Sequence, residues 1–124
     1  MPDSPPHGLM LSDDLIFISK VAGAANALGL AVQPARSAEA LLALAAQQPP
    51  GGVLVDLHNP GLDLEALLGG LRAACPVMPR VVAYGSHVEA ETLRAARKAG
   101  CDLVLPRSKF VEELPVALAG WLSR

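Results

Sequence analysis

Short apolar segments alternate with helical segments along the whole chain. Five runs rich in Leu, Val and Ala have the length of strands, and most are bounded by Gly, Pro or charged residues. These runs are residues 9–12, 30–32, 53–56, 80–84 and 103–105. Uninterrupted apolar runs of this kind are typical of strands that are buried on both faces of a parallel sheet. The pattern therefore predicts a buried five-stranded sheet.

Helical patterns fill the gaps between these strands. After the first strand, residues 15–28 place Phe17, Val21, Ala24 and Leu28 at spacings of three and four, on one helix face. Further helices are predicted over residues 38–46, 64–74 and 89–99. Three of the four helices follow a side chain that suits an N-cap, namely Asp14, Ser37 and Asp63. Glycines suited to a left-handed helix end follow two of them, Gly29 and Gly100.

The last helix is harder to place, because Pro115 lies inside the apolar segment 110–122. Proline fits only the first turn of a helix without loss of a hydrogen bond. We therefore expect a short turn over residues 108–112 and a helix that begins near Glu113 or Leu114. Trp121 is expected to pack the end of this helix against a neighbour.

The order of these elements predicts the fold class. Five strand–helix units give a doubly wound parallel α/β fold of the flavodoxin-like type, with strand order 2-1-3-4-5 and helices on both faces. We expect residues 1–7 to form a flexible tail and residues 8–124 to form a single domain. In this fold, ligands bind at the carboxyl ends of the strands.

Carboxylates are predicted at that edge of the sheet. Asp56 closes the third strand, and Asp13 and Asp14 follow the first. Three carboxylates in one cleft repel one another unless a cation lies between them, and Mg²⁺ suits oxygen ligands of this kind. A carboxylate beside such an ion could act as a nucleophile toward a phosphoryl donor.

Composition and charge argue against several classes of function. The net charge is -2 and the sequence pI is about 5.8, which argues against a nucleic-acid-binding face. No apolar run is long enough to span a bilayer, and the N-terminus lacks the pattern of a secretory leader. Cys75 and Cys101 have no metal-binding spacing and are expected to be thiols in a reducing cytoplasm.

These segments together resemble the receiver domain of bacterial two-component response regulators, over nearly the whole chain. Residues 11–14 are similar to the end of the family's first strand, residues 53–63 to its phosphoacceptor segment, and residues 100–106 to the entry to its fifth strand. Pro60 lies four residues after Asp56, as in the family.

The resemblance implies that Asp56 is the phosphoacceptor. It implies that Asp13, Asp14, Asp56 and the backbone carbonyl of His58 bind Mg²⁺. It also implies a stand-alone, non-enzymatic receiver in phosphorelay signalling, which receives its phosphoryl group from a histidine kinase or phosphotransfer protein. Such a receiver signals to a downstream protein by contact. Homodimerisation through the fourth helix and fifth strand is left open.

The second half of the chain departs from the family pattern. Gly85 occupies the position of the family's switch Thr or Ser, and Ser86 comes one residue later. Arg107 stands in place of the family's lysine, and Lys109 is the nearest lysine. Val104 replaces the family's aromatic residue on the fifth strand. We therefore consider Gly85, Ser86, Arg107 and Lys109 as an altered phosphate-contact set.

Three alternatives remain beside a phosphorylated receiver. The first is a pseudo-receiver, a protein-interaction adaptor that works without phosphorylation. The second is a cobalamin-binding domain, since residues 56–61 fit D-x-H-x-x-G, although that motif belongs after a first strand. The third is a flavodoxin-like small-molecule binder, which would need a glycine-rich phosphate loop where Asp13 and Asp14 stand.

Overall fold

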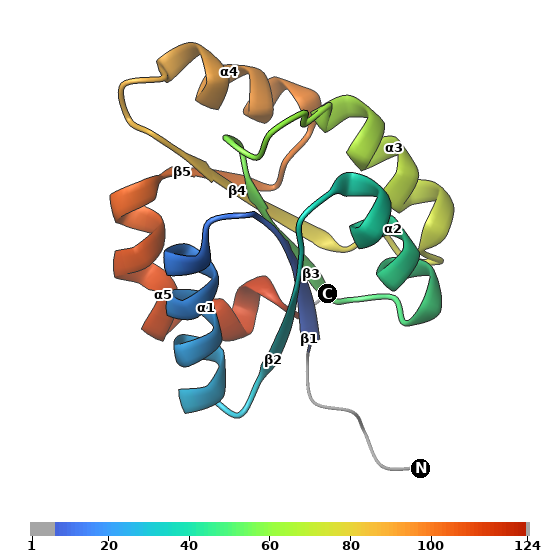
Figure 1. Ribbon diagram of the computed structural model, residues 1–124, viewed down its shortest axis with the longest axis horizontal. Coiled ribbons are helices and arrows are strands. Elements are labelled where there is room, and N and C mark those ends of the chain that lie inside the picture. Colours follow the sequence, from blue (N-terminus) through green and yellow to red (C-terminus); the bar gives the residue numbers. More distant parts are fainter. Residues whose placement is uncertain (1–6, 124) are drawn as a thin grey trace.

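The computed structural model describes residues 7–123, which form one parallel sheet covered by helices on both faces (Figure 1). In chain order the elements are β1 (His7–Leu11), α1 (Leu15–Ala27), β2 (Ala31–Ala35), α2 (Ala38–Gln47), β3 (Gly52–Asp56), α3 (Leu64–Ala74), β4 (Arg80–Gly85), α4 (Ala90–Ala99), β5 (Leu103–Pro106) and α5 (Arg107–Trp121). The strand order is β2-β1-β3-β4-β5. The predicted fold class and strand order are confirmed.

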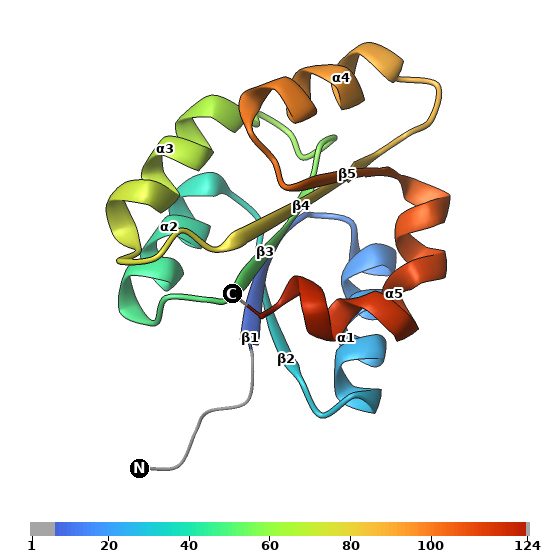
Figure 2. The same ribbon diagram turned by 180° about the vertical axis from the view of Figure 1, so that it is seen from behind.

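Each face of the sheet has its own apolar core. Alternate residues of β1 show the division: Leu9 and Leu11 pack with α2, α3 and α4, whereas Met10 packs with α1 and α5. Figure 2 shows α1 and α5 together on one side of the sheet and the other three helices on the opposite side. Because side chains alternate along a strand, the central strands are apolar on both faces.

Strand and helix ends agree closely with the sequence prediction. Asp14, Ser37 and Asp63 each accept a hydrogen bond from a backbone amide of the helix that follows. Gly29 and Gly100 both have positive φ and follow the helices that they were predicted to end. β2 is longer than predicted and contains Pro34, which is tolerated because β2 is an edge strand. His7 belongs to β1, and the rest of the predicted tail lies outside the described residues.

The prediction for the last helix was wrong. A single helix, α5, runs from Arg107 to Trp121 with Pro115 inside it. The ring of Pro115 lies on the exposed side, while Phe110, Leu114, Leu118 and Trp121 are buried at spacings of four, four and three. Burial of this face offsets the hydrogen bond that proline cannot make. The ribbon of α5 bends along its length in both views (Figures 1 and 2), as expected for a helix with an internal proline.

The end of α5 crosses the amino ends of the central strands, close to Gly52. A Cβ atom on Gly52 would overlap the carbonyl oxygen of Trp121, so glycine is needed for this close approach. Both ribbon views place the last turn of α5 beside the amino ends of β1 and β3 (Figures 1 and 2). The carboxyl ends of the strands, on the opposite side of the molecule, carry the candidate site.

Candidate functional site

Three polar side chains form a row across the carboxyl ends of the central strands: Ser12, Asp56 and Tyr84. Asp56 at the end of β3 is paired with Tyr84 of β4, and Leu11 is paired with Val55, which places Ser12 opposite Asp56. Paired residues of parallel strands point to the same face. All three are buried, with 0%, 5% and 0% of Ser12, Asp56 and Tyr84 exposed.

Asp56 is buried with both of its carboxylate oxygens hydrogen-bonded. The Ser12 hydroxyl donates to Oδ2 over 2.9 Å, and the backbone N–H of His58 donates to Oδ1 over 2.9 Å. These bonds compensate for the loss of water around a buried charge. Asp56 is therefore a held, oriented carboxylate at the strand end.

The neighbouring acidic residues are arranged differently from Asp56. Asp14 caps α1, and its Oδ1 accepts from the amides of Ile16 at 3.0 Å and Phe17 at 3.3 Å. Asp13 is exposed to solvent. Among residues 7–123, no group of three His, Cys, Asp or Glu side chains is placed to hold a metal ion. The structure therefore does not bring the three predicted carboxylates together.

Ser12, and neither of the two aspartates that follow it, donates a hydrogen bond to Asp56. Its hydroxyl also accepts a hydrogen bond of 3.0 Å from the amide of Asp14. Ser12 thus links the end of β1, the start of α1 and Asp56. The Asp14 carboxylate is engaged as the cap of α1. The predicted ligands that would remain for Mg²⁺ are Asp13, Asp56 and the carbonyl of His58, and Mg²⁺ accepts so small a protein set because it retains several waters.

His58 connects the Asp56 segment to the end of β4. Its ring Nε2 accepts a hydrogen bond of 2.9 Å from the backbone N–H of Ser86. Gly85 is buried at this point, and a Cβ there would lie 3.3 Å from His58 Nε2 and 3.3 Å from Leu93 Cδ2. The predicted switch positions, Gly85 and Ser86, therefore lie beside the His58 side chain.

Tyr84 lies outside the predicted metal and phosphate-contact residues, and its place beside Asp56 was not predicted. Its hydroxyl has no hydrogen bond of regular geometry to any described residue. Burial raises the pKa of Tyr84, and the negative charge of Asp56 raises it further, while contact with Ser12 acts in the opposite direction. The signal in the sequence was a polar aromatic residue at the end of a strand predicted to lie next to that of Asp56.

All four aromatic side chains of the chain form one continuous stack. The ring centroids of Phe17 and Tyr84 are 5.3 Å apart, those of Tyr84 and Phe110 are 4.2 Å apart, and those of Phe110 and Trp121 are 5.4 Å apart. The Arg107 guanidinium lies over the outer ring, 5.4 Å from the centroid of Phe17. The stack thus runs from the neighbourhood of Asp56 to the end of α5.

Arg107 and Lys109 have different surroundings, although the sequence alone left both as phosphate contacts. Arg107 and Ser86 line the same hollow of about 530 Å³, together with Phe17, His87, Ser108 and Val111. Lys109 instead forms an ion pair of 3.3 Å with Glu113 along α5, and this contact raises its pKa. Arg107 is therefore the cation that shares a hollow with Ser86.

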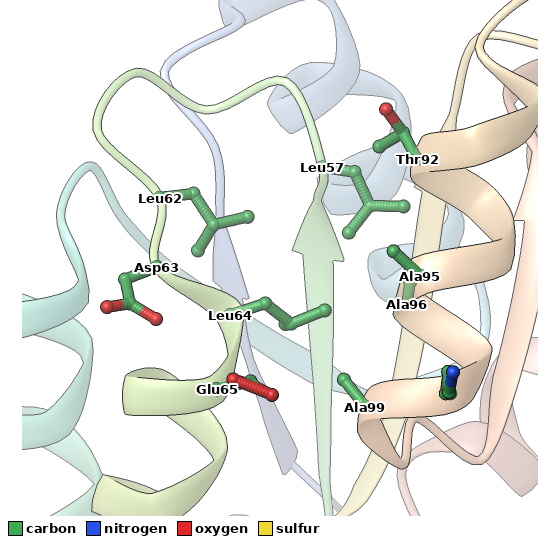
Figure 3. A pocket seen from close by; sticks show the side chains of 10 residues that line it. Leu57, Leu62, Asp63, Leu64, Glu65, Thr92, Ala95, Ala96 and Ala99 are labelled. Carbon is green, nitrogen blue, oxygen red and sulfur yellow. The ribbon is translucent and has the colours of Figure 1, made fainter.

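A larger hollow of about 880 Å³ lies between α3 and α4 (Figure 3). Leucine side chains of the β3–α3 segment face small alanines of α4 across it, and Figure 3 shows Leu57 and Leu64 pointing toward Ala95 and Ala96. The row of Ser12, Asp56 and Tyr84 does not line this hollow.

No family model and no curated protein matches the sequence. Several solved structures do match the fold. A protein assigned as a response regulator from Chloroflexus aurantiacus is 21% identical, covers 98% of this chain and 100% of its own length, and gives a TM-score of 0.81. The receiver domain of NtrX from Brucella abortus is 26% identical, with 93% and 97% covered and a TM-score of 0.77.

The signal receiver domain of NarL from Mycobacterium tuberculosis is 20% identical, with 95% and 96% covered and a TM-score of 0.73. The structural neighbours of the chain are thus receiver domains of response regulators, and the chain has their fold. None of the helices within residues 7–123 has the length and apolar character needed to cross a membrane.

Proposed function

We propose that this chain, which has the fold of response-regulator receiver domains, works in phosphorelay signalling as a cytoplasmic receiver. In this proposal Asp56 accepts a phosphoryl group from a histidine kinase or phosphotransfer protein. The new state is passed to a downstream protein by contact. The observation that carries the proposal is the position of Asp56, buried at the end of the central strand β3 with both oxygens held.

The two oxygens of Asp56 are suited to different roles in this reaction. Oδ1 is held by a backbone amide of His58, whereas Oδ2 is held by the Ser12 side chain, whose hydroxyl proton can turn to another acceptor. Oδ2 is therefore the oxygen that can be released to attack phosphorus. In transfer from a phosphohistidine, the new bond joins Oδ2 to phosphorus, the P–N bond breaks, and the leaving imidazole nitrogen keeps the electron pair and takes up a proton.

Positive charge for the transferred group would come from two sources. Arg107 offers a fixed guanidinium, whose planar donors suit phosphate oxygens. Mg²⁺, held by Asp13, Asp56 and the carbonyl of His58, would neutralise developing negative charge when bound. Asp14 is left out of this set because its carboxylate caps α1.

A second candidate is an adaptor that binds its partner without phosphorylation. Two observations favour it: a hydroxyl rather than a carboxylate lies beside Asp56, and the β4–α4 segment already has a bond to His58. In this case the fold supplies a binding surface, and the chemical state of Asp56 does not change it.

Incubation with Mg²⁺ and acetyl phosphate, followed by intact-mass measurement, separates the two candidates. The first predicts one phosphoryl adduct on the wild-type chain and none on Asp56→Asn. It also predicts less adduct for Asp13→Asn than for Asp14→Asn, since asparagine can still cap α1. Absence of an adduct, under conditions that modify an ordinary receiver, would rule out the phosphorylated receiver and leave the adaptor.

A further inference from the structure

The ladder between β3 and β4 continues past the ends of both strands through a side chain. The backbone N–H of Leu57 donates to the carbonyl of Tyr84 over 2.9 Å, as in a regular parallel ladder. The next bond on this side is made by the amide of Ser86, and its acceptor is the imidazole Nε2 of His58 at 2.9 Å. The ring therefore takes the place of a backbone carbonyl as the acceptor.

This hydrogen bond determines the tautomer of the His58 ring. An imidazole nitrogen that accepts a hydrogen bond carries no proton, so the neutral ring has its proton on Nδ1. The bond spans 28 residues of sequence, from the segment after Asp56 to the first residue after β4. It therefore ties two segments that otherwise leave the sheet separately.

The position between the two segments is filled by Gly85, which is buried. A Cβ on residue 85 would lie 3.3 Å from His58 Nε2 and also 3.3 Å from Leu93 Cδ2, closer than side-chain carbons normally approach. A serine or threonine at residue 85 would therefore compete with the His58 ring for space. Glycine at residue 85 therefore leaves the space that the His58 ring occupies.

We propose that His58 is a positioning residue that fixes the β4–α4 segment, residues 86–89, against the Asp56 segment at all times. The position of the segment is then set by the resting chain and does not depend on the state of Asp56. We call the hydrogen bond between the Ser86 amide and the His58 ring the clamp. The clamp is independent of the proposed function, and only its consequence for signalling rests on Asp56 phosphorylation.

The direct test is NMR on uniformly ¹⁵N-labelled protein. A hydrogen bond from an amide to an imidazole nitrogen gives a scalar coupling between the two ¹⁵N nuclei, so a cross-peak is expected between Ser86 N and His58 Nε2. His58→Ala should accelerate hydrogen exchange of the Ser86 amide by roughly tenfold, by removing its hydrogen-bond acceptor. His58→Gln, whose side-chain oxygen can accept the same bond, should restore protection. His87→Ala, an exposed histidine in the same segment, is the matched control and should leave the exchange unchanged.

A double-mutant cycle tests the fit between His58 and Gly85. Gly85→Ser should raise the unfolded fraction by roughly tenfold in the wild-type background and by clearly less in the His58→Ala background, because the two side chains compete for one space. An equal loss in both backgrounds, or no cross-peak together with unchanged Ser86 exchange in His58→Ala, would overturn the proposal.

The consequence for signalling is tested on protein whose phosphoryl adduct has been verified by mass. The cross-peak between Ser86 N and His58 Nε2 and the slow exchange of the Ser86 amide should persist on phosphorylation of the wild type, whereas this amide should exchange faster in the double variant His58→Ala, Gly85→Ser. Loss of the cross-peak in the phosphorylated wild type would contradict a permanent connection. A missing adduct would instead overturn the proposed function, while the cross-peak and the mutant cycle would still decide the clamp.

Discussion

The two sides of Asp56 are held by different kinds of contact. On the β1 side, the Ser12 hydroxyl joins Asp56 to the amide of Asp14, whose carboxylate caps α1, and Asp13 between them is exposed. On the β4 side, Tyr84 lies inside an aromatic stack, and Ser86 is bound to His58. The β1 side therefore depends on a few polar bonds, whereas the β4 side depends on packing and one bond between segments.

The difference shows where this fold tolerates change. A single hydrogen bond contributes about 1 kcal/mol to stability, whereas a buried aromatic side chain contributes several times as much. A substitution that removes one hydrogen bond on the β1 side should therefore cost less stability than one that removes a packed aromatic ring on the β4 side.

The largest expected effect tests the aromatic support of the β4 side. Phe110 is fully buried between Tyr84 and Trp121, so Phe110→Ala should lower the free energy of unfolding by about 3–5 kcal/mol. Urea unfolding followed by circular dichroism measures the loss. Fluorescence of Trp121, the single tryptophan, should also change in the folded protein.

The matched control for Phe110→Ala lies on the same helix. Val116 is 88% exposed, and Val116→Ala should change stability by no more than about 0.5 kcal/mol. A loss below about 1 kcal/mol for Phe110→Ala would mean that the stack does not support this side of the site.

Much of the fold was predictable from sequence because its signals are local or periodic. The caps at Asp14, Ser37 and Asp63 were found because each side chain satisfies amides within three residues of itself. The course of α5 was not predicted, because the local cost of Pro115 is offset by burial of the apolar face on both sides of it, and that burial depends on tertiary packing.

The candidate site was predictable only in part. The place of Asp56 followed from the apolar strand that precedes it. The register between β1 and β3 did not follow from the sequence pattern. A shift of one residue in this register decides whether Ser12 or Asp13 lies beside Asp56. The direction of the His58 ring and the stacking of Phe17 on Tyr84 depend on contacts between distant segments.

The second prediction changes the β1 side alone. Ser12→Asp would place a second buried carboxylate beside Asp56, and without a cation this should cost about 3 kcal/mol at neutral pH. Added MgCl₂ should restore part of the loss, because a divalent cation relieves the repulsion. Urea unfolding in EDTA and in MgCl₂ measures both effects.

Ser12→Asn is the control for Ser12→Asp, because it has nearly the same shape without the charge. It should lose less stability in EDTA than Ser12→Asp and should gain less from MgCl₂. Stability of Ser12→Asp equal to that of the wild type in EDTA would show that the site is more open to solvent than the burial of Ser12 indicates.

The smallest expected effect is a gain of stability, and it concerns Tyr84. Its buried hydroxyl lacks a hydrogen bond of regular geometry to the described residues, and an unsatisfied buried polar group is destabilising. Tyr84→Phe keeps the stacked ring and should raise the free energy of unfolding by about 0.5–1 kcal/mol. Phe110→Tyr, which adds a hydroxyl inside the same stack, is the control and should lower it. A loss of stability in Tyr84→Phe would show that the hydroxyl forms a stabilising bond with Ser12 or Asp56.

The stability gap between Tyr84→Phe and the wild type should also widen at alkaline pH. Burial and the charge of Asp56 raise the pKa of Tyr84 above its ordinary value of 10.0, so the folded protein keeps the phenol protonated while the unfolded chain ionises. Stability from this group is complete below pH 10.0 and is lost as pH rises above it. Burial also raises the pKa of Cys101, to about 11, but this thiol is present in both proteins and affects both equally. Urea unfolding at a series of pH values should therefore give a steeper decline for the wild type, the only form with a tyrosine, and parallel curves would contradict the burial of its hydroxyl beside Asp56.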